Sequence, residues 1–368
     1  TRRKAASPDT GATPPYETVA LVLQGGGALG SYQAGVYQGL HEAGIRPNWI
    51  SGISIGSINA AIIAGSPEDE RVERLRGFWE SICRPAGFAS VPWGDTLAGM
   101  FEGIPFGFGS PAMNGQLSAF QALFSGQPGF FKPRFPPPYW VHGKGAASTS
   151  FYDTTPLAAT LRQYIDFDLL NAGAVRASFG VVNVRSGNFA YFDSLRHTLG
   201  PEHIMASGAL PPGFPSVEID GEHYWDGGYS GNPALHPLIY QTETSDILLV
   251  QINPIEHLDL PHSGQEIMER MNEVTFNASL LAELRAIEFV RRLLAEGKLD
   301  ARRYKSVRMH RIDGGAVLEP FGADSKARAD MAFVRKLFAL GRTAGQEWLH
   351  AHRKDVGVRP TINIAENT

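Results

Sequence analysis

The chain is poor in cysteine, in excess charge of either sign and in long hydrophobic runs, and each shortage excludes a class of protein. Cys83 is its one cysteine, which excludes an intrachain disulfide framework and a zinc site built from thiolates alone. The 33 basic and 37 acidic residues leave a net charge of -4, so nothing favours a nucleic acid as partner. The longest aliphatic runs, at 19–23 and 247–250, are too short to span a bilayer. We therefore expect a cytoplasmic protein or one that is attached peripherally to a membrane.

The first residues are also poor in apolar side chains. Residues 1–16 carry three basic residues followed by proline, glycine and threonine, without the apolar core of a signal peptide, and we expect a disordered leader there. Since the first residue is not Met, an upstream segment with a secretion signal is left open. A length of 368 residues allows one large domain or two, at about 150 residues per domain.

Two strand–loop–helix units follow the leader. A short apolar run at 18–23, typical of a buried parallel strand, leads through a glycine loop into a predicted helix at 31–43. A second predicted strand at 49–53 leads through Ser54 into a helix-compatible stretch at 56–64. Two such units predict an α/β fold with a mostly parallel central sheet. They also predict a ligand crevice at the carboxyl ends of the strands, where both loops would lie.

The middle of the chain departs from this pattern. Residues 84–140 are rich in Pro, Gly and aromatic residues and lack helical periodicity, which indicates an insertion. Beyond it the sequence predicts hairpins at 178–192 and 217–224, a buried strand at 246–252, a long helix at 265–294, a strand at 304–312 and a last helix at 326–354. We divide the chain into a main domain at 17–264 and a C-terminal extension of helices and a strand at 265–368, packed on it.

The residues Gly52-Ile53-Ser54-Ile55-Gly56 form the pattern G-x-S-x-G between a predicted strand and a predicted helix, which is the context of a nucleophile elbow. Small residues two positions before and after the serine let the strand turn sharply. The hydroxyl then stands over a helix N-terminus, whose amides favour negative charge. Because Gly and Ser are common in turns, the alternative is that Ser54 only caps its helix.

The glycine loop has two interpretations. The spacing Gly25-x-Gly27-x-x-Gly30 after a strand is that of a dinucleotide-binding loop. That use needs an acidic residue about 20 positions on, at the end of the second strand, where this chain has none. The other interpretation is that the backbone amides of Gly25, Gly26 and Gly27 face an oxyanion, as acyl transfer requires, and a neighbouring elbow serine favours it.

A serine nucleophile also needs a base to accept its proton. The tripeptide Asp226-Gly227-Gly228 ends the second hairpin and is a candidate, although such a tripeptide alone is only a turn. In a Ser-Asp-His hydrolase the base would be a histidine. The histidines in the region where it could lie are His203, His223, His236 and His257, none with a distinguishing context.

Taken together and in this order, the motifs resemble those of the patatin-like phospholipases. The matching pieces are the glycine loop at 25–30, the elbow at 52–56, the segment 206–221 and Asp226-Gly227-Gly228. They span roughly 19–235, and the tail after about 265 resembles the C-terminal extension of a bacterial subgroup. The resemblance implies a three-layer sandwich and an enzyme that needs neither metal nor cofactor.

The resemblance also implies roles for individual residues. Ser54 is the nucleophile and Asp226 the base of a Ser-Asp dyad. The amides of Gly25, Gly26 and Gly27 are the oxyanion donors, and Gly52, Gly56, Gly227 and Gly228 support these residues. Because a free aspartate has a pKa of about 3.9 and is a poor base, Asp226 must lie in a dry crevice. The insertion at 84–140, with Phe101, Phe106, Phe108, Phe130, Phe131 and Trp140, is interpreted as a lid, with a loop packed into the core or a dimer contact as the alternatives.

Two departures from family patterns bear on the substrate. Leu29 stands where the patatin-like loop often has Lys or Arg, which makes Leu29 a candidate for substrate selectivity and favours neutral esters over phospholipids. A cation from another strand, Arg176 or Arg185, would reverse that expectation. Ile53 stands where the malonyl-type acyltransferases carry histidine, which disfavours transfer to an acyl carrier.

We therefore expect a serine esterase or lipase that cleaves carboxylic esters of lipids through an acyl-Ser54 intermediate. Phospholipid, neutral glyceride and hydroxyalkanoate substrates are left open, as is self-association. The alternatives are a catalytically vestigial protein that binds lipid or membrane, and an oxidoreductase with a nucleotide cofactor in the Gly25 loop. The stretch 285–311, with nine basic and three acidic residues, is either a solvated face or a weak contact with anionic membrane.

Overall fold

A computed structural model describes residues 19–83, 126–141, 143, 145–233, 235–240, 246–256, 260–321, 323–328 and 330–362. The expected leader at 1–16 and residues 84–125 of the expected insertion lie outside the described residues.

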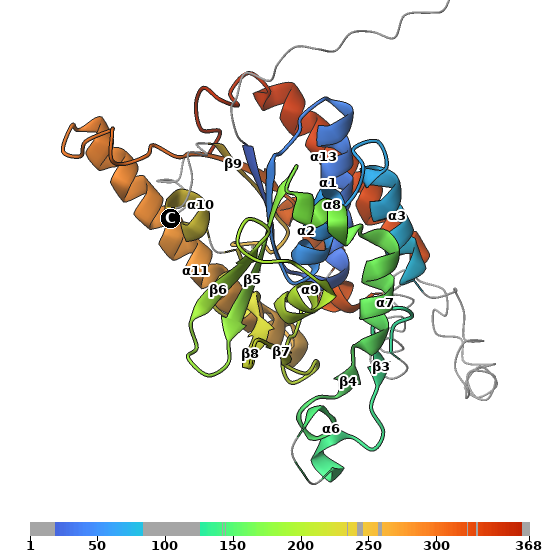
Figure 1. Ribbon diagram of the computed structural model, residues 1–368. Coiled ribbons are helices and arrows are strands. Elements are labelled where there is room, and N and C mark those ends of the chain that lie inside the picture. The colour runs from blue at the N-terminus through green and yellow to red at the C-terminus, as the bar shows by residue number, and fades with distance from the viewer. Residues whose placement is uncertain are drawn as a thin grey trace, which may run out of the picture.

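A mixed sheet of eight strands forms the centre of the molecule (Figure 1). Its parallel strands lie in the order β10 (Arg308–Asp313), β9 (Asp246–Gln251), β1 (Val19–Leu23), β2 (Trp49–Ile53) and β5 (Arg176–Asn183). The antiparallel strands are β6 (Phe189–Asp193), β7 (Val217–Ile219) and β8 (Glu222–Asp226). The predicted α/β fold with a mostly parallel sheet is therefore confirmed, as are the two hairpins.

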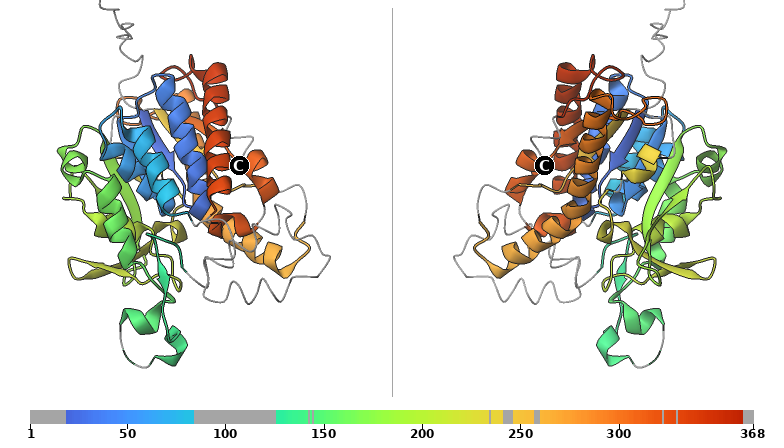
Figure 2. Two further views of the ribbon diagram at one scale, coloured as in Figure 1. Left: turned by 90° about the vertical axis from the view of Figure 1, so that its right-hand side faces the viewer. Right: turned by 90° about the vertical axis from the view of Figure 1, so that its left-hand side faces the viewer.

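Helices cover both faces of the sheet and give three layers (Figure 2). One face carries α1 (Gly30–Glu42), α2 (Ile55–Ala64), α3 (Arg71–Ser81), α7 (Thr155–Tyr164), α8 (Phe167–Ala172), α9 (Pro201–Ser207) and α13 (Met331–His352). The other carries α10 (His236–Tyr240) and α11 (Gly264–Ala295). Strand β1 serves both cores, because successive side chains of a strand point to opposite faces: Leu21 and Leu23 pack into the first core, and Ala20 and Val22 into the second.

The residues after 264 build onto this same sheet. β10 extends the sheet beside β9, and α13 lies against α1 so closely that a Cβ atom on Gly341 would come within 1.9 Å of the Tyr32 carbonyl oxygen. The last strand was expected from residue 304 but begins at Arg308, whose guanidinium lies 2.6 Å from the Asp246 carboxylate at the start of β9. None of the described helices is both long enough and apolar enough to cross a membrane.

Strand β5 changes its partner along one edge, and this change brings two segments together at the carboxyl end of the sheet. β6 pairs with the other edge from Ser178 to Val182. On the shared edge β2 pairs as far as Gly180, which is opposite Ile53, and β8 takes over at Val181, which is opposite Asp226. Since Ser54 directly follows Ile53, the switch from β2 to β8 brings Ser54 and Asp226 to the same point.

A small arm, which we define as residues 132–153, projects beyond the carboxyl ends of the parallel strands (Figures 1 and 2). Two short antiparallel strands, β3 (Lys132–Pro133) and β4 (Tyr152–Asp153), form its base. A 3-10 turn at Pro138–Trp140 and helix α6 (Ala146–Thr149) lie farther out. The pairing of β3 with β4 joins residues 132–133 to residues 152–153, so the segment between them forms one unit. The expected end of the insertion at 140 therefore falls inside the arm.

Candidate active site

Ser54 occupies a sharp turn between β2 and α2. Its φ of 54° lies in the left-handed region, which costs a non-glycine residue about 1–3 kcal/mol. A Cβ atom on Gly52 would lie 2.2 Å from the carbonyl oxygen of Gly56, and one on Gly56 would lie 2.4 Å from that of Leu23. Both positions therefore require glycine, and the strained serine sits at the N-terminus of α2.

A buried serine that the sequence analysis gave no role holds this turn. The Ser54 amide donates a hydrogen bond of 3.0 Å to Ser207 Oγ, which itself donates one of 2.7 Å to the Gly180 carbonyl oxygen. Ser207 ends α9 and is fully buried. Ser207 lies in the segment 206–221, which resembles the patatin-like pattern. That resemblance did not predict the hydrogen bond between Ser207 and the Ser54 amide.

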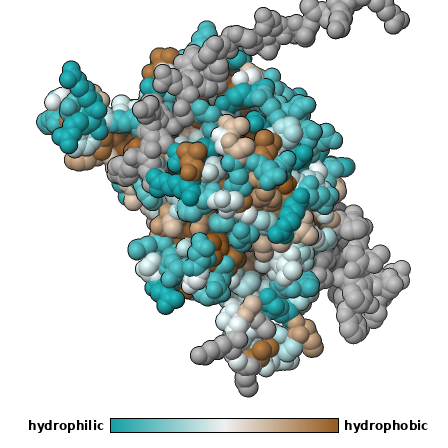
Figure 3. Space-filling view, in the orientation of Figure 1, coloured by the Kyte–Doolittle hydropathy of each residue, from teal (hydrophilic) through white to brown (hydrophobic). Residues whose placement is uncertain are grey.

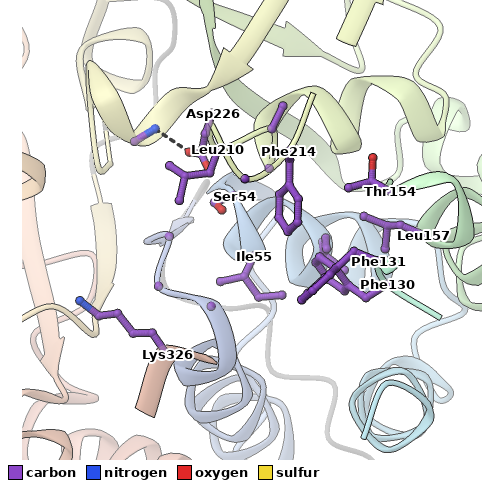
Figure 4. Close-up of a pocket in the computed structure, with 18 of the residues that line it drawn as sticks. Ser54, Ile55, Phe130, Phe131, Thr154, Leu157, Leu210, Phe214, Asp226 and Lys326 are labelled. Carbon is purple, nitrogen blue, oxygen red and sulfur yellow. Dashed lines mark hydrogen bonds between the residues drawn. The ribbon is translucent and has the colours of Figure 1, made fainter. Parts of the chain in front are cut away.

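Asp226 lies beside Ser54 at the end of β8, with 3% of its surface exposed (Figure 4). Burial raises the pKa of its carboxyl to about 6, although hydrogen bonds with the Ser54 side chain and the Gly228 amide act to lower it. The Gly228 amide donates to Asp226 Oδ1 over 2.8 Å. A Cβ atom on Gly227 would lie 2.4 Å from the Gly180 carbonyl oxygen, so glycine is required there for close packing against β5.

The glycine loop after β1 lies next to Ser54, since a Cβ atom on Gly25 would come within 3.0 Å of the Ser54 Cβ. The Gly25 amide donates a hydrogen bond of 2.7 Å to Asn232 Oδ1. This amide was expected to face an oxyanion, and it is engaged instead. Within the described part of the chain, the amides of Gly26 and Gly27 have no hydrogen-bond partner, so two of the three expected donors are available.

Three buried side-chain amides hold the glycine loop in place, those of Gln24, Asn232 and Asn253, and the sequence had given none of them a role. Gln24 Nε2 donates to the Asn232 carbonyl oxygen over 2.8 Å, and Gln24 Oε1 accepts from the Ile252 amide over 2.8 Å. Asn253 Nδ2 donates to the Gly25 carbonyl oxygen over 2.7 Å. Gln24 follows β1 and Asn253 closely follows β9, so a polar residue just after a buried parallel strand was the available signal.

A cavity of about 470 Å³ opens over Ser54 and Asp226. Ile55, Phe130, Phe131, Leu157 and Phe214 lie on one side of Ser54, and Lys326 lies on the other side with its ammonium directed away from Ser54 (Figure 4). The further apolar lining includes Ile58, Trp79, Ile82 and Tyr152, and the polar lining includes Gly25, Gly26, Gly27, Asn232 and Asn253. The arrangement can hold an apolar chain on one side of the Ser54 hydroxyl and a polar group on the other.

Leu29 is not in this lining. Its side chain is buried in the core beneath the start of α1, with 4% of its surface exposed. A selectivity role for Leu29 through contact with the substrate is therefore not supported. Neither proposed cation replaces it: Arg176 begins β5 at the opposite end of the sheet and pairs with Asp193 at 2.8 Å, and the exposed Arg185 lies 3.4 Å from Glu222.

None of the three candidate histidines within the described residues lines the cavity. Nδ1 of His203 accepts the Gly200 amide over 2.9 Å, and Nδ1 of His236 lies 3.1 Å from Glu283. His223 lies on β8, largely exposed, and His257 falls outside the described residues.

Three of the nine basic residues in the stretch 285–311, Arg291, Lys298 and Arg308, form ion pairs with acidic residues. Arg291 pairs with Glu288 at 3.0 Å and Lys298 with Glu296 at 2.6 Å, while Arg308 binds the buried Asp246. These contacts favour a solvated face.

The aromatic residues of the expected insertion separate into groups. Phe101, Phe106 and Phe108 lie outside the described residues. Phe130 and Phe131 form part of the cavity wall, where the Phe131 ring lies 5.3 Å from that of Phe214. Trp140 lies on the arm with 73% of its surface exposed.

The chain is similar to known proteins over the part that builds this site. A family model described as patatin-like phospholipase matches residues 21–239. A patatin-like phospholipase domain-containing protein of Caenorhabditis elegans is 35% identical over 96 residues, which make up 24% of this chain and 7% of that protein. Triacylglycerol lipase ptl3 of Schizosaccharomyces pombe is 44% identical over 59 residues, 16% of this chain and 12% of that protein. The chain therefore spans a small fraction of the length of these relatives.

A solved structure also resembles the chain. The superposition with VipD from Legionella pneumophila includes 91% of this chain and 67% of the VipD chain. The TM-score is 0.44 and the sequence identity is 14%.

Proposed function

The chain belongs to the patatin-like phospholipase family, whose model covers more than half of it, and from this premise we propose that it hydrolyses carboxylic esters of lipids with Ser54 and Asp226. Family membership supports hydrolysis of lipid esters in general. The observation that carries the finer proposal is the buried carboxyl of Asp226 beside a strained serine in a largely apolar cavity.

In the first step, Asp226 accepts the proton of the Ser54 hydroxyl as Ser54 Oγ attacks the ester carbonyl carbon. A pKa of about 6 makes the carboxylate a better base than an ordinary aspartate and leaves it ionised at neutral pH. The tetrahedral intermediate then collapses, and the alcohol leaves with the proton held by Asp226. The acyl group remains bound to Ser54.

The developing oxyanion is stabilised by backbone amides. Those of Gly26 and Gly27 are the candidates, because the Gly25 amide is engaged by Asn232. The Asn232 contact then has a positioning role: it fixes the loop so that the next two amides stay in place. The N-terminus of α2 adds a favourable field at Ser54.

In the second step, water attacks the acyl carbon while Asp226 accepts its proton, and the released Ser54 takes the proton back. The phenylalanine-lined side of the cavity suits the acyl chain, because each buried methylene contributes about 0.8 kcal/mol. The alcohol portion then lies toward the glycine loop and Asn253.

Covalent labelling tests this proposal. An excess of an alkyl fluorophosphonate should label the full chain at Ser54, as located by peptide mass spectrometry, and should abolish hydrolysis of p-nitrophenyl butyrate. Ser54→Ala should not be labelled, whereas Ser81→Ala, on the outer helix α3, should react like the wild type. An unlabelled but folded wild-type chain would favour the vestigial lipid-binding alternative.

A further inference from the structure

The arm carries aromatic side chains that the protein leaves in solvent. Phe135, Tyr139 and Trp140 expose 91%, 79% and 73% of their surface. Figure 3 shows pale and brown residues on this lobe at the lower end of the molecule. Large aromatic side chains gathered on one projecting segment mark a contact surface, because exposing them to water is unfavourable.

The base of the arm is part of the cavity. Phe131, which precedes the arm, and Tyr152 both line the cavity, and their rings lie 4.8 Å apart. The Tyr152 amide donates to the Gly213 carbonyl oxygen over 2.9 Å, and Gly213 lines the cavity as well. The Arg134 amide donates to the Phe151 carbonyl oxygen over 2.8 Å. These contacts hold the base of the arm beside the cavity, so the exposed aromatic residues lie on a segment that is joined directly to the cavity wall.

The first half of α11 offers a second apolar surface on the same side of the molecule. Its exposed residues are Ile267, Met268, Met271 and Val274, with 48%, 60%, 59% and 53% of their surface in solvent. The spacing 267, 271 and 274 places three of them on one helix face. Farther along the helix, Phe276 lines the cavity and its ring lies 6.0 Å from that of Tyr229, which is half exposed.

We propose that the arm and the first half of α11 together dock the protein on the surface of a lipid layer, with the cavity facing that layer. This inference rests on the proposed function, because it names where the substrate comes from. Tyr and Trp suit the boundary between lipid and water, with an apolar body and a polar tip, while Phe, Met and Ile enter the acyl region. Both surfaces adjoin the cavity, through Tyr152 of the arm and Phe276 of α11. A partner protein bound across both surfaces would therefore close the cavity, whereas a lipid layer would supply ester substrate to it.

The docking is hydrophobic rather than electrostatic. The exposed residues named on both surfaces are uncharged, and three of the nine basic residues at 285–311, Arg291, Lys298 and Arg308, are paired with acids. Binding should therefore be similar for zwitterionic and anionic vesicles and should change little with salt, unlike attraction by a polybasic segment.

Vesicle sedimentation with the full chain tests the proposal. The triple variant Phe135→Ser, Tyr139→Ser and Trp140→Ser should bind phosphatidylcholine vesicles at least about tenfold more weakly than the wild type. The matched control is Leu195→Ser, Tyr304→Ser and Val358→Ser, which removes side chains with exposures of 64%, 44% and 71% near the amino ends of the strands. The control should bind within about twofold of the wild type.

Hydrolysis of dissolved p-nitrophenyl butyrate separates docking from chemistry, and the arm variant should keep the wild-type kcat/KM. Docking is contradicted if the arm variant and the control bind vesicles equally. It is also contradicted if the arm variant loses self-association in sedimentation velocity while its vesicle binding is unchanged, since the arm would then contact protein. A wild type that binds vesicles through the arm but does not cleave the soluble ester would keep the docking and refute the proposed function.

Discussion

Replacing Asp226 by Asn should inactivate the protein and stabilise its fold at neutral pH. Burial raises the pKa of this carboxyl from 3.8 to about 6, and each unit corresponds to about 1.4 kcal/mol. The ionised carboxylate therefore destabilises the folded state by about 3 kcal/mol. Asn keeps the shape and the Oδ1 that accepts the Gly228 amide but never ionises, so Asp226→Asn should recover up to that amount.

The pH dependence follows from the direction of the shift. Below about pH 3.8 both folded and unfolded chains hold the proton, and Asp226 contributes no difference. Between 3.8 and about 6 the unfolded chain releases the proton first, so the free energy of unfolding falls as pH rises. Above about pH 6 the full loss persists. The advantage of Asp226→Asn should therefore be largest at pH 7 to 8 and should fall to about 0.5 kcal/mol near pH 4.

Denaturant unfolding at pH 4 and pH 7.5 provides the measurement, with Asp246→Asn as the matched control. Asp246 is equally buried, but hydrogen bonds from His310 and Arg308 outweigh the effect of burial and hold its pKa far below the usual value. Removing its charge leaves Arg308 without its partner and should lower stability at pH 7.5 by about 3 kcal/mol or more. A destabilised Asp226→Asn at pH 7.5, or an equal gain at both pH values, would refute the reasoning.

Three further predictions concern activity and the core. On dissolved p-nitrophenyl butyrate, kcat/KM should fall about tenfold per pH unit well below pH 6, because protonated Asp226 cannot accept the Ser54 proton; a flat profile down to pH 4.5 would place the base elsewhere. Leu157→Trp, which fills the end of the cavity, should lower kcat/KM for a C12 ester relative to a C4 ester by about tenfold, and an unchanged ratio would remove the acyl chain from that side. Leu29→Arg buries a charge in the core and should lower the free energy of unfolding, measured by urea denaturation, by several kcal/mol. A variant with normal stability and an altered headgroup preference would restore Leu29 as a selectivity residue.

Most strands of the sheet could be predicted because their signals are local. The apolar runs that became β1, β2 and β9, the glycine loop after β1 and the two hairpins follow from periodicity and turn chemistry within a few residues. The start of β10 was placed four residues too early. A long-range ion pair, from Arg308 to Asp246, marks where that strand begins, and alternation of side chains does not reveal it.

The sequence could name the residues of the candidate site but not the hydrogen bonds among them. The turn at Ser54 follows from its motif and the pairing with Asp226 from the resemblance to the patatin-like family, but the engagement of the Gly25 amide depends on Asn232, which is 207 positions away. Leu29 was a candidate for substrate selectivity because it stands where the patatin-like loop often has Lys or Arg. Instead the chain enters α1 there, and the side chain turns into the core.

In the proposed mechanism Ser54 and Asp226 act as one unit, and a double-mutant comparison of kcat tests this cooperation. On p-nitrophenyl butyrate at pH 7.5, Ser54→Ala, Asp226→Asn and the double variant should each lose at least about a thousandfold, with the double variant little worse than either single one. Unfolding curves measured on the same samples show that each variant is folded. Near-normal turnover by Asp226→Asn, or losses that multiply in the double variant, would contradict the dyad.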